Sequence, residues 1–258
     1  MSLVDNRPVI EFRNVSYRIP NGSELLTNLD LQVVGGETLV LLGRSGSGKT
    51  TTLKLINRLL EATDGDLLVE NRSLREWDVI RLRRMIGYVI QEIGLFPHFT
   101  IERNIGLVPR IEKWPMEKIN ARVHELLQLT GLDSKIASRY PHELSGGQRQ
   151  RVGVARALAA DPPILLMDEP FGALDPITRI ELQQEFRDLQ KRLGKTVVFV
   201  THDVREALLL GSRIAVMHDG RLIAIHTPQD FVNSPDPVIQ SYLEALELPV
   251  DLPQRRRA

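Results

Sequence analysis

The stretch that decides the fold reads Thr38-Leu-Val-Leu-Leu-Gly43-Arg-Ser-Gly-Ser-Gly-Lys49-Thr50. It opens with a short, uninterrupted apolar run, which is typical of a strand buried on both faces of a parallel sheet. A glycine-rich turn follows, and helical spacing continues from Thr50 to Leu60. A strand, a glycine-rich loop and a helix in this order predict the first βα unit of an α/β fold.

The loop of this unit matches the pattern G-x-x-x-x-G-K-[ST] and has the strand-to-helix context that the pattern requires. Glycines let backbone N–H groups curl around phosphate oxygens, and the amino end of the helix adds positive potential. Lys49 is expected to reach the outer phosphates and the Thr50 hydroxyl to bind Mg²⁺. The predicted nucleotide-binding residues of this segment are Gly43, Arg44, Ser45, Gly46, Ser47, Gly48, Lys49, Thr50 and Thr51.

Strands are also predicted on both sides of this unit. The ranges 9–17 and 29–34 are β-rich and precede the Gly35-Gly36 turn, so we expect an amino-terminal antiparallel β subdomain. Further short apolar runs at 86–90, 164–167 and 197–200 predict buried strands. The last two runs are separated by a helix over 177–193 that is expected to end at Gly194. This is the alternation of a parallel α/β sheet.

Two other segments have a local signature. Residues 92–141 have helical spacing and little strand signal, so we predict an inserted helical subdomain there. Near the carboxyl end, Asp219-Gly220 lies between the β-rich ranges 213–218 and 221–226, and this dipeptide suits a type I′ hairpin turn.

A second chemical motif follows the predicted strand 164–167, which ends in Asp168-Glu169. Two acids at the carboxyl end of an apolar strand form the Walker B arrangement, with Asp168 near Mg²⁺ and Glu169 near the attacking water. A carboxylate in that place acts as a general base or orients the water. Because the same chain contains a phosphate-binding loop, the Walker B interpretation is favoured over the alternative that Asp168 and Glu169 are two solvated acids at a strand end.

A third motif, Leu144-Ser-Gly-Gly-Gln148, precedes a helical run over 149–159. A serine hydroxyl and exposed helix amides at this point can bind an anion. Because the chain already has one phosphate-binding loop, a second such site suggests two chains paired head to tail. The residues expected to contact the partner's nucleotide are Ser145, Gly146, Gly147 and Gln148.

With these motifs in this order the chain resembles the ATP-binding cassette family, whose signature is Leu-Ser-Gly-Gly-Gln, from about Val9 to Val232. The resemblance implies that Gln91 contacts the metal or water and senses the γ-phosphate, and that His202 contacts the γ-phosphate. It implies that Tyr17 stacks on adenine, although a tyrosine in a strand is by itself more often part of the core. It also implies that the turn 173–175 crosses a dimer interface.

The resemblance further implies a P-loop NTPase (RecA-like) core within a single nucleotide-binding domain, 1–258. We expect the core with its β subdomain at 1–91 and 142–245, the helical subdomain at 92–141 and a tail at 246–258. The implied ligands are ATP and Mg²⁺, with Thr50, Gln91 and Asp168 at the metal and Glu169, His202 and Gln91 as catalytic residues. Two chains would sandwich two ATP molecules, as a homodimer or as a pair with a close relative.

The wording of three segments, 56–59, 92–100 and 168–179, is similar to bacterial importers of osmoprotectants such as glycine betaine, carnitine or choline. That implies an integral membrane permease as partner and, indirectly, an extracytoplasmic substrate-binding protein. Leu95, Phe96 and Phe99 are candidates for the groove that receives the permease, or else core of the helical subdomain. Import of another solute, such as an amino acid, and a mechanotransmission ATPase that moves no substrate are the alternatives.

Composition excludes several other classes. The chain has 258 residues with 33 basic and 33 acidic side chains, so no net field favours a nucleic-acid partner. It has no cysteine, which excludes disulfides and thiolate metal sites. Apolar runs are far shorter than the roughly 20 residues of a membrane helix, so any membrane span must be supplied by another chain. The resemblance to importers implies a peripheral place at the cytoplasmic face of the membrane. Arg255–Arg257 form the one charge run, interpreted as a solvated tail.

Overall fold

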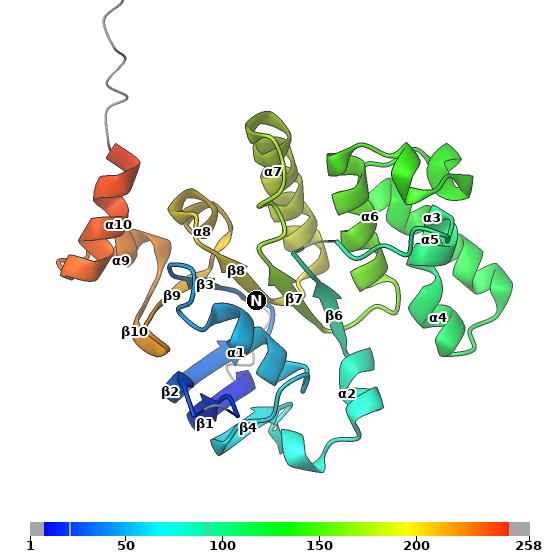
Figure 1. Ribbon diagram of the computed structural model, residues 1–258. Helices are drawn as coiled ribbons and strands as arrows, with labels where there is room; N and C mark the ends of the chain where they lie inside the picture. The colour runs from blue at the N-terminus through cyan, green and yellow to red at the C-terminus, as the bar shows by residue number, and fades with distance from the viewer. Residues whose placement is uncertain (1–7, 21, 92, 248–258) are drawn as a thin grey trace, which may run out of the picture.

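The computed structural model describes residues 8–20, 22–91 and 93–247, so the predicted tail run Arg255–Arg257 lies outside the described residues. Two sheets organise this part of the chain (Figure 1). The larger has six strands in the order β10-β9-β3-β8-β7-β6, and the smaller has four in the order β2-β1-β4-β5. The strands are β1 (Pro8–Arg18), β2 (Glu24–Val34), β3 (Thr38–Leu42), β4 (Asp64–Val69), β5 (Arg72–Ser73), β6 (Ile86–Val89), β7 (Ile164–Asp168), β8 (Thr196–Thr201), β9 (Arg213–His218) and β10 (Arg221–His226).

The six-stranded sheet is parallel from β6 through β7, β8 and β3 to β9. Every residue of β3, β7 and β8 is buried. Successive residues of β3 belong to different core clusters: Leu39 and Leu41 pack on one face, and Val40 and Leu42 on the other. A strand with two buried faces needs a continuous apolar run, and this confirms the interpretation of Thr38–Leu42.

The predicted amino-terminal antiparallel strands are confirmed, because β1 pairs antiparallel with β2. The hairpin prediction is confirmed as well. β9 and β10 pair with Arg221 opposite His218, and Asp219 and Gly220 have φ of 44° and 73°. Positive φ at both central residues is what a type I′ turn requires.

Helices cover both sheets: α1 (Lys49–Ile56), α2 (Val79–Arg84), α3 (Ile101–Ile105), α4 (Leu107–Ile111), α5 (Met116–Leu129), α6 (Gly146–Leu158), α7 (Pro176–Leu193), α8 (Val204–Leu210), α9 (Pro228–Val232) and α10 (Pro237–Glu247). The predicted end of α7 is confirmed, since its C-cap Gly194 has the left-handed φ of 59°. Short 3₁₀ turns complete the set: η1 (Leu74–Glu76), η2 (Ser134–Ser138) and η3 (Pro141–Glu143).

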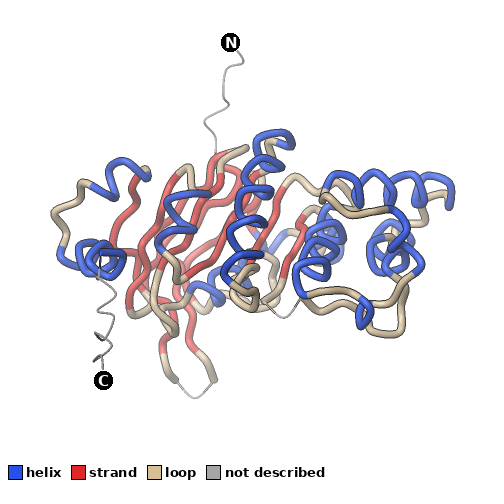
Figure 2. The backbone as a smooth tube through the Cα atoms, turned by 90° about the horizontal axis from the view of Figure 1, so that it is seen from above, coloured by secondary structure: helices blue, strands red, loops and turns tan. Residues whose placement is uncertain are grey.

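Helices α3 to α6 gather on one side of the six-stranded sheet (Figures 1 and 2). Residues 93–141 contain no strand, which agrees with the helical segment predicted there. The next helix, α6, packs against α3 and α5 and also against β6. It therefore joins this helical segment to the sheet.

The helix after the glycine-rich loop is shorter than predicted. It was expected to continue to Leu60, but α1 ends at Ile56. Arg58 takes a left-handed φ of 53°, and its guanidinium donates hydrogen bonds to the backbone oxygens of Leu74 and Trp77. These contacts with a distant turn stabilise the break, and helical spacing alone contains no sign of them.

Candidate nucleotide site

The glycine-rich loop has the backbone shape of an anion cradle. Gly46 and Gly48 have φ of 82° and 95°, a region that favours glycine, and Gly48 is the N-cap of α1. A Cβ at Gly48 would lie 2.6 Å from the Leu26 side chain, so no other residue fits there. The loop therefore presents backbone N–H groups at the amino end of α1, where the helix dipole favours negative charge.

Lys49 places a buried cation inside the same loop. Its Nζ donates hydrogen bonds to the backbone oxygens of Gly43 at 2.8 Å and Arg44 at 2.9 Å. Burial lowers the pKa of Lys49, while the charges of Glu169 and Asp168 act in the opposite direction. Burial makes the charged form of the ammonium group unfavourable, so an anion that enters the loop stabilises that charged form.

One polar atom of the loop is left without a partner. The Ser47 hydroxyl is buried and has no hydrogen-bond partner among the described residues. Leaving a buried hydroxyl unpaired costs about 1–3 kcal/mol. An oxygen-rich ligand held by the surrounding loop would satisfy such a group, so the unpaired atom agrees with the phosphate interpretation.

Thr50 and Asp168 meet although 118 positions separate them in the chain. The Thr50 hydroxyl donates to Asp168 Oδ1 at 2.9 Å, and the Tyr88 hydroxyl donates to Oδ2 at 3.4 Å. Burial raises the pKa of Asp168, and the Thr50 hydrogen bond acts against that rise. A hydroxyl beside a carboxylate offers the hard oxygen ligands that Mg²⁺ prefers. No sequence motif marks Tyr88, and only the fold brings it here.

Glu169 and His202 form the second pair of the site. His202 Nδ1 lies 3.1 Å from Glu169 Oε2, and the Glu169 backbone N–H donates to the Val200 oxygen at 3.0 Å. Glu169 has a φ of 43°, uncommon for a residue with a side chain, and such conformations cluster at functional sites. The backbone bond to β8 holds the carboxylate in place next to the loop.

Most of these groups line one open cavity of about 700 Å³, whereas Gly43 and Asp168 are not among its lining residues and Asp168 reaches it through its hydrogen bond with Thr50. Its walls bring together the ends of four neighbouring strands: the loop after β3, Gln91 after β6, Glu169 after β7 and His202 after β8. Ligands of open α/β sheets bind at this edge, beyond the carboxyl ends of the strands. The lining residues are Leu25, Arg44, Ser45, Gly46, Ser47, Gly48, Lys49, Thr50, Thr51, Gln91, Glu169, His202 and Tyr242.

Tyr17 is not among those lining residues. It lies in β1 opposite Leu26, and its ring packs against the core cluster between the two sheets. Its assignment to adenine stays a prediction. Leu25, the neighbour of Leu26, lines the cavity instead, as does Tyr242 of α10.

The signature segment lies elsewhere on this chain. Ser145 is the N-cap of α6: its hydroxyl accepts a hydrogen bond from the Gln148 N–H, and the Gln148 side chain accepts one from the Ser145 N–H. Ser145 is exposed, and none of the four signature residues lines the cavity. The turn 173–175 is its neighbour, since a Cβ on Gly146 would lie 3.7 Å from the Leu174 side chain.

A buried network missed by sequence reasoning supports the segment that carries His202. Glu206 of α8 accepts hydrogen bonds from Thr201 Oγ1 at 2.6 Å and from Gln183 Nε2 of α7 at 2.9 Å. Only 4% of Glu206 is exposed, and burial raises the pKa of its carboxyl group. Thr201 directly precedes His202, so this carboxyl group fixes the end of β8. No motif marks an acid whose partners are set by helix packing.

Glu206→Gln is expected to change the pH dependence of stability. A carboxyl group whose pKa is raised by folding costs no stability below its unfolded pKa, and the cost grows as pH rises through the folded pKa. The variant lacks this cost, so its free energy of unfolding should gain on that of wild type as pH rises above the ordinary pKa of a glutamate, by about 1.4 kcal/mol for each unit by which folding raises the pKa of Glu206. Urea unfolding at each pH measures it. A difference between the two proteins that does not vary with pH would contradict the role of burial.

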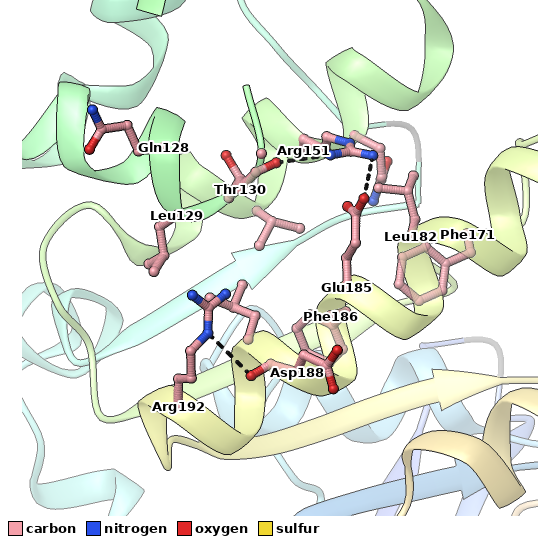
Figure 3. Close-up of a pocket in the computed structure, with 14 residues that line it drawn as sticks. Gln128, Leu129, Thr130, Arg151, Phe171, Leu182, Glu185, Phe186, Asp188 and Arg192 are labelled. Carbon is pink, nitrogen blue, oxygen red and sulfur yellow. Dashed lines mark hydrogen bonds and ion pairs between the residues drawn. The ribbon is translucent and has the colours of Figure 1, made fainter. Parts of the chain in front are cut away.

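A second cavity, of about 310 Å³, lies between α5, α6 and α7 (Figure 3). Arg151 bridges its walls by donating to Glu185 Oε1 at 2.8 Å and to the Thr130 oxygen at 3.2 Å. None of the predicted site residues lines it. Phe171, two residues after Glu169, forms part of its wall. The cavity therefore lies between helices α5 and α6 on one side and α7 with the residues after β7 on the other.

A groove of about 280 Å³ lies on the other side of α6. Phe96 lines this groove and is 40% exposed. Leu95 packs against the core instead. The Phe99 ring packs at a tilt against that of Phe96, with ring centroids 5.2 Å apart. The buried Asn104 side chain holds this loop: it accepts from the Phe96 N–H and donates to the oxygens of Phe96 and Phe99. The remaining lining residues are Arg83, Arg84, Ile86, Gly87, Tyr88, Leu107, Val108, Arg156, Ala157, Ala160 and Pro162.

Comparison with known proteins agrees with this geometry. Residues 26–172 match the model of the ABC transporter family. The chain is 51% identical over 227 residues to the glycine betaine/carnitine/choline transport ATP-binding protein OpuCA of Bacillus subtilis, covering 88% of this chain and 60% of that one. It is 49% identical over 227 residues to the glycine betaine uptake system ATP-binding protein YehX of Escherichia coli, covering 88% and 73%.

Among solved structures, the dimeric post-hydrolysis structure of the ATP-binding cassette MJ0796 bound to ADP and Pi has a TM-score of 0.75 at 36% identity. It covers 85% of this chain and 98% of that one. The fold described above is that of an ATP-binding cassette, and the chain belongs to the ABC transporter family. It spans about three fifths of the length of several curated relatives that it matches.

No helix within the described ranges 8–20, 22–91 and 93–247 is both long and apolar enough to cross a membrane.

Proposed function

We propose that this chain binds and hydrolyses MgATP. The proposed site of the reaction is the cavity of about 700 Å³ at the glycine-rich loop 43–51, which is called the P-loop below. The observation that carries the proposal is the convergence, in one cavity, of the P-loop, Gln91, Glu169 and His202 from four different strand ends. The loop N–H groups and Lys49 would hold the phosphates, and Glu169 would accept a proton from the attacking water or orient it.

Mg²⁺ fits the donor set at Thr50 and Asp168. The two oxygens are already 2.9 Å apart, and Mg²⁺ is typically bound by one or two protein oxygens together with phosphates and water. When bound, the ion supplies positive charge that neutralises the phosphate oxygens in the transition state. Asp168 must be ionised to bind it, and Gln91, an exposed residue that lines the cavity, is the third proposed ligand.

The site is proposed to be completed by a second copy of the chain. The signature residues Ser145 to Gln148 expose an amino helix end away from the cavity, next to the turn 173–175. Ile177 and Ile180, at the start of α7, are 73% and 55% exposed. An exposed anion-binding helix end flanked by exposed apolar residues suits a dimer interface that places the signature over the partner's ATP.

The biological role proposed is to power import of a small solute, an osmoprotectant quaternary amine, through a separate permease at the cytoplasmic face of the membrane. The resemblance to OpuCA and YehX supports it. The groove at Phe96 is the proposed docking site, because it combines exposed apolar surface with the cations Arg83, Arg84 and Arg156. An extracytoplasmic binding protein would deliver the solute to the permease.

The test is reconstitution of the chain with its co-purified membrane partner in liposomes. MgATP inside the liposomes is expected to drive uptake of radiolabelled glycine betaine or choline, and Glu169→Gln should abolish that uptake. Amino acids serve as the comparison solutes, and their transport in place of betaine would contradict the proposed substrate class. ATP turnover that moves none of these solutes would favour a mechanotransmission ATPase.

A further inference from the structure

Tyr242 lines the proposed nucleotide cavity although it is distant in sequence from every motif of the chain. It belongs to α10, and it lines the cavity together with the P-loop. Apart from the His202 imidazole, it has the one aromatic ring among the described residues that line this cavity. The segment that matches the family model ends at residue 172, before α10 begins.

The rest of α10 holds this ring in place. Ile239, Leu243 and Leu246 are spaced as one helix face and pack against the main core cluster, with Ile239 fully buried. Asp236 Oδ1 accepts hydrogen bonds from the N–H groups of Val238 at 2.8 Å and Ile239 at 3.3 Å, which caps the helix start. The position of Tyr242 is therefore set by packing.

The hydroxyl group of Tyr242 is buried and has no hydrogen-bond partner among the described residues. The charge and the backbone N–H of Arg44 lie near the hydroxyl oxygen and act against a rise in its pKa, but an N–H group cannot accept the hydroxyl proton. Burial raises the pKa of this hydroxyl, so it is protonated at neutral pH and able to donate. A buried hydroxyl with a free proton, beside the first residues of a phosphate-binding loop, is costly unless a ligand accepts that proton.

We infer that Tyr242 is a nucleotide-binding residue whose hydroxyl donates a hydrogen bond to a phosphate oxygen of the bound nucleotide on the Arg44 side of the P-loop. This inference rests on the proposed function. It differs from the role predicted for Tyr17, which is stacking on the base. It also gives α10 a part in the site, so that nucleotide binding and docking of the carboxyl-terminal helix stabilise one another.

Tyr242→Phe tests the inference because it removes only the hydroxyl and keeps the packed ring. If the hydroxyl faces the ligand, the nucleotide-free variant loses an unpaired buried group, and its melting temperature should equal or exceed that of wild type. Its dissociation constant for the magnesium complex of AMPPNP, measured by calorimetry, should rise about three- to tenfold. Tyr140→Phe, on the exposed turn η3, is the matched control and should change neither value.

Two results would overturn the inference. The first is unchanged AMPPNP affinity in Tyr242→Phe. The second is a lower melting temperature of the nucleotide-free variant, which would assign the hydroxyl a structural role. Lys49→Ala separates this from failure of the proposed function: if Lys49→Ala retains wild-type affinity, the cavity is not the nucleotide site, whereas loss in Lys49→Ala with unchanged affinity in Tyr242→Phe contradicts only the role of Tyr242.

Discussion

Glu169→Gln is expected to lower the ATP turnover of this chain about 100-fold or more while leaving ATP affinity near that of wild type. A positioned general base contributes about 10²–10⁴ to a rate, and an amide cannot accept the proton. The substitution keeps the shape of the side chain, and an amide still hydrogen-bonds His202, which lies 3.1 Å from the carboxylate. Phosphate release under saturating MgATP measures turnover.

The matched control for this prediction is Glu117→Gln, an exposed acid in the first turn of α5. It removes one carboxylate from the same chain far from the cavity, and its turnover should equal that of wild type. Turnover in Glu169→Gln within a few-fold of wild type would mean that another group activates the water. The Walker B assignment of Glu169 would then be wrong.

Lys49→Ala is expected to weaken ATP binding about 100-fold. The ammonium group is held inside the loop by the Gly43 and Arg44 oxygens, so it faces the phosphates with little further ordering. Charge-assisted hydrogen bonds are worth about 1.5–3 kcal/mol each. Fluorescence titration with a labelled ATP measures the affinity.

Lys135→Ala, on the exposed turn η2, is the matched control for charge. A melting curve of each variant separates loss of binding from loss of folding, since Lys49 is buried and Lys135 is exposed. Wild-type affinity in a folded Lys49→Ala protein would exclude the P-loop as the phosphate site.

The central sheet was predictable because its signals are local. Runs such as Thr38–Leu42 and Ile164–Met167 are continuous and apolar since both faces of each strand are buried. Parallel strands then place their carboxyl ends at one edge, so motifs at Gly43 and Asp168 were expected to meet. The type I′ turn at Asp219-Gly220 was predictable for the same reason: two adjacent residues determine it.

What escaped prediction depends on contacts between distant segments. The strand β4 and the early end of α1 are fixed by pairing with β1 and by the bonds of Arg58 to a turn 16 to 19 residues away. Packing of α10 on the core places Tyr242 in the cavity, and packing of α8 places Glu206 against Thr201, beside His202. Neither residue lies in a motif, and a single sequence gives no measure of which helix face will be buried against which neighbour.

The site residues themselves divide along the same line. P-loop residues 44–51, Gln91, Glu169 and His202 line the cavity. The predicted residues Gly43, Asp168, Tyr17 and Ser145 to Gln148 do not line it, although Asp168 is hydrogen-bonded to the lining residue Thr50. A composite site in a dimer requires the signature of each chain to lie outside that chain's own nucleotide cavity. For Tyr17, base stacking is still a prediction, and the inference for Tyr242 offers a direct comparison.

The most direct test of the composite site is the mass of Glu169→Gln in solution, measured by light scattering during gel filtration with and without MgATP. A composite site predicts a monomer without nucleotide and a dimer of about 58 kDa, twice the 29.2 kDa chain, with MgATP. Ser145→Arg, which places a large side chain at the exposed signature, should prevent that dimer. A Glu169→Gln protein that binds MgATP and stays monomeric would contradict the account.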